Sequence, residues 1–229
     1  MKKGLDAPLV PILFVGFGLL GIIATLMSNN KLNAIYPLIL LLFGVLYLHT
    51  SLIGKYKIIQ KIVGQTNIPK NAQVLDLGTG HGAFLVEIAK KLKTPGSVTG
   101  IDIWNKNDQS SNSVKNTQKI IDSQGLTDVS RLVTADMTKL PFEDKSFDLV
   151  VASISIHNVK PTSNRKMAIH EAYRVLKPGG EIIIMDIEHV SQYRKILEEL
   201  DVAELTIKNA GVNGMYGLLF TKVLKAKKR

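Results

Sequence analysis

The chain has 229 residues, of which 45% are hydrophobic and none is cysteine, and its formal net charge is +10. This length allows one large domain, or one medium-sized domain with an appendage. The absence of cysteine excludes disulfide bonds, reactions that need a thiolate nucleophile, and metal sites built from thiols.

Two long uncharged segments open the chain. Residues 7–30 carry no charge, and residues 32–54 carry none except on a protonated His49. Each is longer than 20 residues, so as a helix each extends roughly 30 Å or more, enough to cross the hydrocarbon core of a bilayer. We therefore predict a transmembrane helical hairpin in residues 1–54. Its spans are predicted at about 8–28 and 34–53, and a basic linker or helix follows over 55–72.

Other interpretations of the hairpin fit less well. A cleaved signal peptide has a shorter apolar core and a small-x-small site before a polar mature start, and the sequence offers neither. A hairpin buried in a soluble core would show an amphipathic stripe, whereas these segments are apolar all round. Basic residues flank the two outer ends, with one lysine between the spans. The positive-inside rule therefore predicts that both termini and the rest of the chain are cytoplasmic.

The first span contains glycines at 16, 18 and 21, with the spacing of a dinucleotide-binding loop. No strand precedes them and no acidic partner follows, so the context of such a loop is missing. We interpret them as small residues that let two membrane helices approach.

Residues 73–102 predict a pocket for a nucleoside-bearing cofactor. An apolar run over 73–77 reads as a buried parallel strand, and glycines at 78, 80 and 82 then let the backbone turn sharply next to a ligand. A helix is expected over 83–92, with its N-terminal N–H groups directed at that ligand. A second strand ends at Asp102, whose carboxylate can accept both hydroxyls of a ribose.

The segment Asp76-Leu77-Gly78-Thr79-Gly80-His81-Gly82 resembles the first motif of the class I S-adenosylmethionine (SAM) dependent methyltransferases, and further motifs follow in the family's order. They are Asp102, Ala135-Asp136-Met137 with Leu140-Pro141-Phe142, Ser146 to Val151, and Arg174 to Gly180. The resemblance covers roughly residues 60–222 and extends to the ubiquinone/menaquinone C-methyltransferases. It implies a methyltransferase domain over 73–229 that uses SAM as its cofactor.

The resemblance also implies which residues bind SAM. Gly78, Gly80 and Gly82 would line the methionine part of SAM, and Asp76 would hold the loop and the ammonium group. Asp102 would bind the ribose, Ile103 and Trp104 would lie against the adenine face, and Asp136 and Met137 would meet the adenine edge. Thr79 and Ser153 complete the predicted set. The structural alternative for Asp102 and Asp136 is that an acidic residue at a strand end caps the next turn.

The rest of the domain alternates between strands and helices, which predicts an α/β fold with a Rossmann-like, seven-stranded, mostly parallel sheet and a terminal antiparallel hairpin. Five further strands are expected at 131–135, 147–152, 181–186, 204–209 and 217–222, and helices at 113–124, 164–176 and 191–200. The last two strands would pair through residues 211–214.

Two segments are candidates for the acceptor pocket. The polar stretch 105–116 is either a lid over the cofactor or a solvated loop. His157 and Asn158 follow the fourth strand, where the resemblance places the methyl donor. His157 is a candidate general base because its unperturbed pKa lies near neutrality, and the alternative is that it shapes the pocket or bonds to the backbone.

The basic charge has two possible partners, a membrane surface or a nucleic acid. Many of the basic residues flank the apolar segments or lie in the C-terminal tail, as expected next to an anionic leaflet. No basic stripe interleaved with aromatic residues is present, which argues against nucleic acid. The five histidines form no zinc pattern, so no metal site is predicted.

Together these features predict a membrane-anchored, SAM-dependent methyltransferase that acts on a small or lipid-soluble acceptor. Two alternatives remain at this stage: a SAM-binding membrane protein without catalysis, and an RNA methyltransferase held at the membrane.

Overall fold

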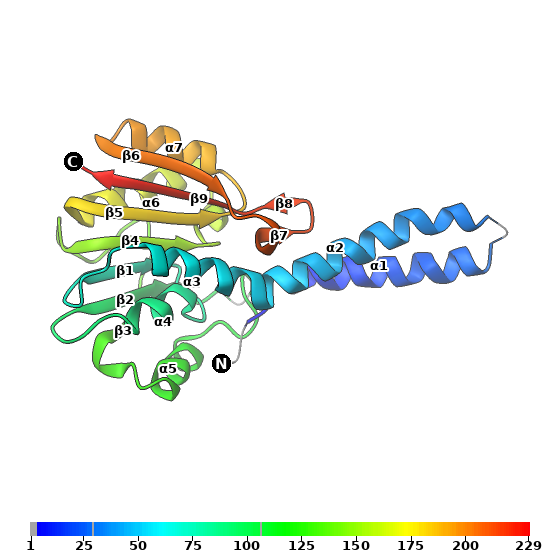
Figure 1. The fold of residues 1–229 in the computed structure, drawn as a ribbon, viewed down its shortest axis with the longest axis horizontal. Helices are drawn as coiled ribbons and strands as arrows, with labels where there is room; N and C mark the ends of the chain where they lie inside the picture. Colours follow the sequence, from blue (N-terminus) through cyan, green and yellow to red (C-terminus); the bar gives the residue numbers. More distant parts are fainter. Residues whose placement is uncertain (1–3, 29, 106) are drawn as a thin grey trace.

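A computed structural model describes residues 4–28, 30–105 and 107–229. An α/β domain carries a helical hairpin that projects from one of its edges (Figure 1). The hairpin consists of α1 (Leu9–Leu26) and α2 (Ile35–His49). One π-helical turn, Thr50–Gly54, joins α2 to α3 (Lys55–Gln65), so a single long helical segment runs from the hairpin onto the domain.

Glycines let the two helices of the hairpin approach closely. A Cβ added at Gly18 would lie 2.7 Å from the side chain of Leu41, and one at Gly44 would lie 2.7 Å from Val15. A Cβ at Gly21 would lie 2.8 Å from Pro37, whereas one at Gly16 would meet nothing within 4 Å. Small residues therefore form the contact between the two helices, as in membrane helix pairs.

The sheet of the domain has seven strands in the order β3-β2-β1-β4-β5-β9-β6. They are β1 (Gln73–Leu77), β2 (Ser97–Asp102), β3 (Ser130–Thr134), β4 (Phe147–Ser153), β5 (Leu176–Asp186), β6 (Val202–Asn209) and β9 (Lys222–Lys228). The first five are parallel, and β9 runs antiparallel between β5 and β6. The chain order reverses between β1 and β4, which is the switch point where ligands bind in such sheets.

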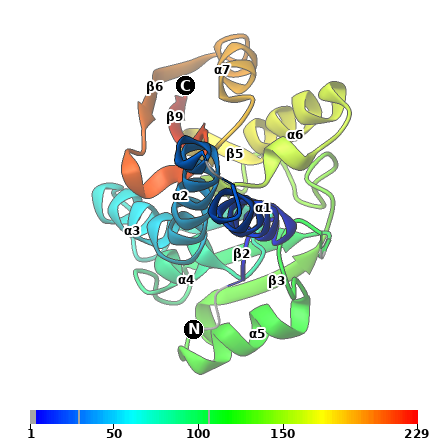
Figure 2. The ribbon, with the colours of Figure 1, turned by 90° about the vertical axis from the view of Figure 1, so that its right-hand side faces the viewer.

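Helices cover both faces of the sheet (Figure 2). They are α3, α4 (Ala83–Ala89) and α5 (Val114–Ser123) on one side, and α6 (Thr162–Val175) and α7 (Val190–Glu198) on the other. Successive residues of each central strand point into opposite cores: Val74 packs with α3 and α4, and Leu75 packs with α6 and α7. Strands buried on both faces explain the continuous apolar runs in the sequence.

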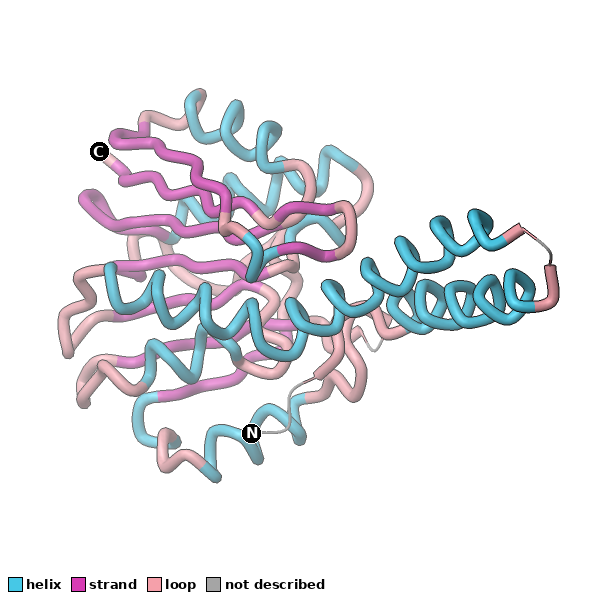
Figure 3. Tube along the Cα trace, turned by 45° about the vertical axis from the view of Figure 1, so that its right-hand side comes forward, coloured by secondary structure: helices cyan, strands magenta, loops and turns pink. Residues whose placement is uncertain are grey.

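The end of the chain differs from the sequence-based expectation. A seventh strand was expected at 217–222, but the strand that pairs with β5 and β6 is Lys222–Lys228. Residues 212–220 instead form a separate small hairpin with β7 (Met215–Tyr216) and β8 (Leu219–Phe220), located beside the domain end of α2 (Figure 3). The prediction was wrong there because it took the apolar residues Leu218 to Phe220 as part of a core strand, whereas their side chains are exposed.

Candidate active site

A cavity of about 350 Å³ lies at the carboxyl ends of the parallel strands. Its walls come from the loops after β1, β2, β3 and β4, which meet at the switch point of the sheet. The hairpin leaves the domain from the same edge, and three residues at its base, Asp6, Lys55 and Tyr56, also line the cavity. The site is therefore built jointly by the domain and the base of the hairpin.

The loop after β1 forms a cradle with glycine at every second position, 78, 80 and 82. Gly78 has φ +67°, and a Cβ there would lie 2.4 Å from the Cβ of Ser155 in the loop after β4. The Ser155 hydroxyl donates to the carbonyl of Leu77 over 2.8 Å, which fixes the two loops against each other. Only glycine fits this combination of left-handed backbone and close approach.

Asp76 is buried beneath this cradle. Its Oδ2 accepts hydrogen bonds from the Thr79 hydroxyl at 2.7 Å and from the backbone N–H of Leu85 at 3.2 Å. Its Oδ1 has no hydrogen-bond partner among the described residues. Burial is the main reason that the pKa of Asp76 is raised to about 7, and the nearby carboxylate of Asp102 adds to the shift.

Asp102 closes the cavity from the end of β2. Its Oδ2 accepts from the backbone N–H of Gly80 at 2.8 Å, and its Oδ1 accepts from the N–H of Trp104 at 2.6 Å and from the Asn112 amide at 3.2 Å. A carboxylate has about four acceptor positions, so capacity for a ligand hydroxyl remains. Asp102 thus both organises the loop and faces the cavity.

The structure brings most of the predicted cofactor-binding residues to one place. Asp76, Gly78, Thr79, Gly80, Asp102, Ile103, Asp136, Met137 and Ser153 all line the cavity. Gly82, Trp104 and His157 are not among the lining residues. The Trp104 indole N–H instead donates to the Thr134 hydroxyl over 2.8 Å, at an exposed position.

His157 lies two residues after the cavity residue Ser155, in a short 3-10 helix, Ile156–Asn158, whose last residue also lines the cavity. Its Nδ1 is 2.6 Å from Oδ1 of the buried Asp186. A carboxylate only accepts hydrogen bonds, so this contact places a proton on Nδ1 and leaves Nε2 as the atom that can take up or release one. Burial opposes protonation of the ring, but Asp186 outweighs it and raises the pKa of His157, with smaller effects from Glu188 and Asp108.

Asp186 is itself held in place, and sequence reasoning missed it. Its Oδ2 accepts from the Tyr193 hydroxyl at 3.2 Å, and its Oδ1 accepts from the N–H of Ile187 at 2.8 Å. The available signal was a carboxylate at the end of β5, one strand away from the loop that carries His157.

Residues 4–7, here called the strap, lie against the glycine loop, and sequence reasoning also missed them. Asp6 pairs in a β-bridge with Gln109, and the Gln109 amide donates to Oδ1 of Asp6 over 2.9 Å. The carbonyl oxygen of the same Gln109 side chain accepts from the backbone N–H of His81 at 3.0 Å. The stretch 105–116, apart from Lys106, which lies outside the described residues, is thus tied to both the strap and the cofactor loop.

A buried cluster around Asp6 joins the strap to the hairpin. Lys55 Nζ lies 2.6 Å from Oδ1 of Asp6, and the hydroxyls of Ser51 and Tyr216 donate to Oδ2 at 3.0 and 2.7 Å. Burial alone would raise the pKa of Asp6, but Lys55 reverses this and holds the pKa below its usual value. Asp6 is the only acidic residue before Asp76 in the sequence, and this was the signal available.

These residues suit SAM chemically. The unpartnered Asp76 Oδ1 offers an acceptor for an ammonium group, Gly78 and Gly80 line the cavity without a side chain of their own, and Asp102 offers an acceptor for a ribose hydroxyl. Within 4–28, 30–105 and 107–229, no group of three or more His, Asp or Glu side chains is placed to hold a metal ion. The sheet order and this cradle are those expected of a class I SAM-dependent methyltransferase domain.

Comparison with known proteins agrees with this class. Residues 75–184 match a family model described as a methyltransferase domain. The chain is 32% identical over 133 residues to demethylmenaquinone methyltransferase of Lactiplantibacillus plantarum, covering 58% of this chain and 52% of that protein. It is 31% identical over 134 residues to sterol 4-C-methyltransferase strm-1 of Caenorhabditis elegans, covering 58% of this chain and 36% of that protein. It therefore contains a class I SAM-dependent methyltransferase domain, and it spans about half or less of these relatives' length.

Solved structures share the fold. A SAM-dependent methyltransferase from Aquifex aeolicus superposes with a TM-score of 0.59 at 18% identity, covering 75% of this chain and 89% of that one. A geranyl diphosphate methyltransferase in complex with GPP and sinefungin gives a TM-score of 0.59 at 14% identity, covering 76% and 77%. At these identities the likeness establishes the architecture alone.

Proposed function

We propose that this protein is a membrane-anchored methyltransferase that transfers the methyl group of SAM to a small, lipid-soluble acceptor and releases S-adenosylhomocysteine. The observation that carries the proposal is the position of the cavity at the foot of the apolar hairpin. Asp6, Lys55 and Tyr56 belong to the base of that hairpin and also line the cavity. A substrate dissolved in the bilayer would therefore arrive next to the site.

The exposed surface of the hairpin supports an anchor. Leu20 on α1 is 63% exposed, and Leu42 on α2 is 54% exposed. Both helices are long and apolar enough to cross a membrane by length and composition. In water, the exposed apolar side chains of the two helices would form a large unfavourable surface, whereas helices that cross lipid are expected to have such a surface. The distribution of lysines around the spans favours a domain on the cytoplasmic side.

The acceptor class is supported by the names of the relatives. They include a demethylmenaquinone methyltransferase, a sterol 4-C-methyltransferase, and the ubiquinone/menaquinone biosynthesis C-methyltransferase UbiE of Rickettsia prowazekii. The last is 33% identical over 122 residues, covering 53% of this chain and 47% of that protein. Transfer to carbon on a quinone-like or sterol-like acceptor is therefore the reaction we favour here.

The residues of the chain divide the work between binding and proton transfer. Asp76 would hold the ammonium group, the glycine cradle the methionine part, and Asp102 the ribose. SAM, when bound, supplies an electrophilic methyl group, so the protein mainly has to align the acceptor and handle its proton. His157 does not line the cavity itself but lies between the lining residues Ser155 and Asn158, and its Nε2 is our candidate to accept that proton. Asp186 would keep the other ring nitrogen protonated and the ring in place.

The test uses the full chain in lipid nanodiscs with SAM labelled in its methyl group. We expect label to enter a lipid extract in a reaction that Asp102→Ala abolishes by removing cofactor binding, measured in parallel by calorimetry with S-adenosylhomocysteine. Binding without any turnover would favour a non-catalytic SAM-binding protein. Label in added RNA, with binding that weakens steeply with salt, would favour an RNA methyltransferase. Either result would contradict the proposal.

A further inference from the structure

The small hairpin at residues 212–220, here called the finger, exposes apolar side chains that the fold does not use. Val212 is 69% exposed, Leu218 68%, Leu219 40% and Phe220 45%. No charged residue occurs between Lys208 and Lys222. Isolated exposed apolar residues are common on soluble proteins, but four in a nine-residue hairpin mark a contact surface.

The finger is fixed to the hairpin rather than free. The Thr50 hydroxyl donates to the carbonyl of Met215 over 2.7 Å, and the rings of Tyr47 and Tyr216 meet edge to face at 4.9 Å between centroids. Gly54 permits the contact, because a Cβ there would lie 2.0 Å from the carbonyl oxygen of Asn213. The finger is therefore held in a fixed position at the domain end of α2.

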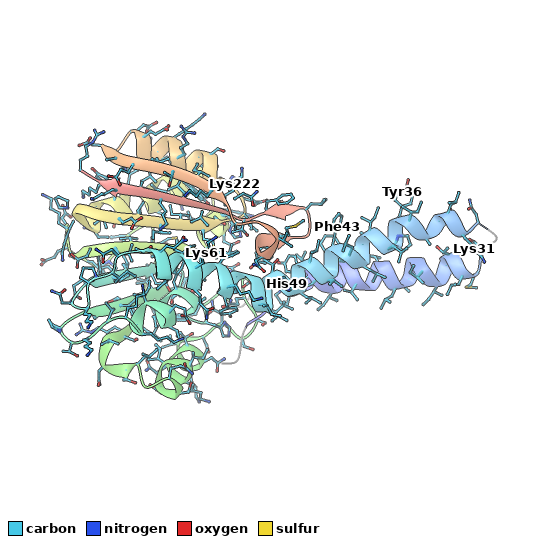
Figure 4. All side chains as sticks on the ribbon, in the orientation of Figure 1. Lys31, Tyr36, Phe43, His49, Lys61 and Lys222 are labelled. Atoms are coloured by element: carbon cyan, nitrogen blue, oxygen red, sulfur yellow. The ribbon has the colours of Figure 1, made fainter. Side chains whose placement is uncertain are left out.

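The tip of the finger lies alongside the apolar part of the anchor. A Cβ at Gly217 would lie 3.4 Å from the ring of Phe14 and 3.7 Å from Phe43. Phe14 is the sixth residue of α1, about 8 Å along the axis from its first residue at 1.5 Å per residue. Figure 4 places Phe43 on the projecting part of α2, beyond His49, and Lys222 back on the domain.

The length of the anchor then fixes the level of the tip. The 18 residues of α1 span about 27 Å, close to the ~30 Å thickness of a hydrocarbon core. To cover that core, α1 has to be immersed over nearly its whole length, which places Phe14 inside the lipid. The tip of the finger, in contact with Phe14, reaches the same level.

We propose that the finger inserts Leu218, Leu219 and Phe220 into the leaflet that the anchor enters from the domain side. This inference rests on the proposed membrane anchor and adds a third point of attachment. Pairing of Met215 with Phe220 and of Tyr216 with Leu219 satisfies backbone groups that lipid cannot. Three attachment points would hold the cavity mouth against the bilayer, where a lipid-soluble acceptor enters, more firmly than the two helices alone.

The experiment uses the absence of cysteine, because any introduced cysteine is then unique. Three full-length variants, Leu218→Cys, Leu42→Cys and Lys70→Cys, carry an NBD fluorophore in phosphatidylcholine/phosphatidylglycerol vesicles. Leu42 lies on α2 and is the reference for a position in lipid. Lys70 is exposed, precedes β1 at the edge of the sheet opposite the cavity, and is the reference for a position in water. All three side chains are exposed, so labelling leaves the core unchanged.

We expect the label at 218 to lose most of its emission to lipids with doxyl-labelled acyl chains and little to aqueous iodide, as the label at 42 does. The label at 70 should behave in the opposite way. If doxyl-labelled lipids quench the label at 42 while iodide reaches the label at 218, the finger proposal is overturned and the anchor is kept. An iodide-accessible label at 42 would overturn the anchor itself, and the finger proposal with it.

Discussion

The hairpin and the α/β domain use the same apolar residue types in opposite ways. In α1 the buried residues are Pro11, Gly18 and Thr25, so its large side chains point outward. In α4 five of seven residues are buried, and the one charged residue, Glu87, is partly exposed. The domain follows the rule for a protein in water, and the hairpin follows the rule for a protein in lipid, where helices meet through small residues.

The junction between the two regions is where removing one side chain should cost most. Lys55→Ala would leave Asp6 buried without its cation, and breaking a buried ion pair in this way typically costs about 3–5 kcal/mol. The free energy of unfolding of the full chain in mixed micelles should fall by that order. Lys57→Ala, on the exposed side of the same helix, is the control and should change little. Equal losses in the two variants would contradict the role of the Asp6–Lys55 pair.

The next effect should be confined to the domain. We expect His157→Ala to lower kcat by about 100-fold or more, the contribution of a general base, while affinity for S-adenosylhomocysteine stays unchanged. The raised pKa of His157 means that its neutral form accumulates only above the usual 6.5, so kcat/KM should rise with pH through that higher value. Asp186→Asn removes the main cause of the shift and should move the inflection to lower pH. An inflection that stays in place would leave Asp186 with a purely structural role.

A third substitution tests the hairpin alone. Gly18→Leu should destabilise the helix pair by about 1–3 kcal/mol, the usual cost of overpacking, because its new Cβ would meet Leu41. Gly16→Leu lies on the same helix, faces open space and should have little effect. SDS titration in mixed micelles, followed by circular dichroism, compares the two. Leu has a higher helix propensity than Gly, so a loss confined to position 18 points to the contact between the helices. The same loss at both positions would contradict the role of that contact.

Sequence reasoning predicted the central sheet and selected nine residues that line the cavity, because both depend on short-range patterns. Apolar runs that end at Asp76 and Asp102 predicted neighbouring strands, and the glycines predicted the turn between strand and helix. The strap and the finger could not be predicted in this way. Asp6 meets Gln109 and Tyr216 across more than 100 residues of chain, and no local pattern encodes such a contact.

The two regions also contain contrasting buried carboxylates. Asp6 has Lys55 beside it, and its pKa lies below the usual value, so it stays ionised. Asp76 has no cation among the described residues, and its pKa is raised to about 7. The unfolded chain would lose this proton near 3.8, so the contribution of Asp76 to stability is complete below that value and is lost as pH rises towards 7.

A ligand ammonium group at Asp76 would supply the missing cation and favour the ionised form. The ionised fraction of a group with pKa 7 rises about tenfold between pH 6 and 8, so affinity for S-adenosylhomocysteine should rise by about that factor, or ~1.4 kcal/mol. Asp76→Asn should bind more weakly at pH 8 and lose the pH dependence. The control ligand is 5′-methylthioadenosine, which has the adenosine but no ammonium group, and calorimetry should give it a flat profile. If the affinities for both ligands rose equally with pH, Asp76 would be a structural residue of the loop and not the partner of the ligand's ammonium group.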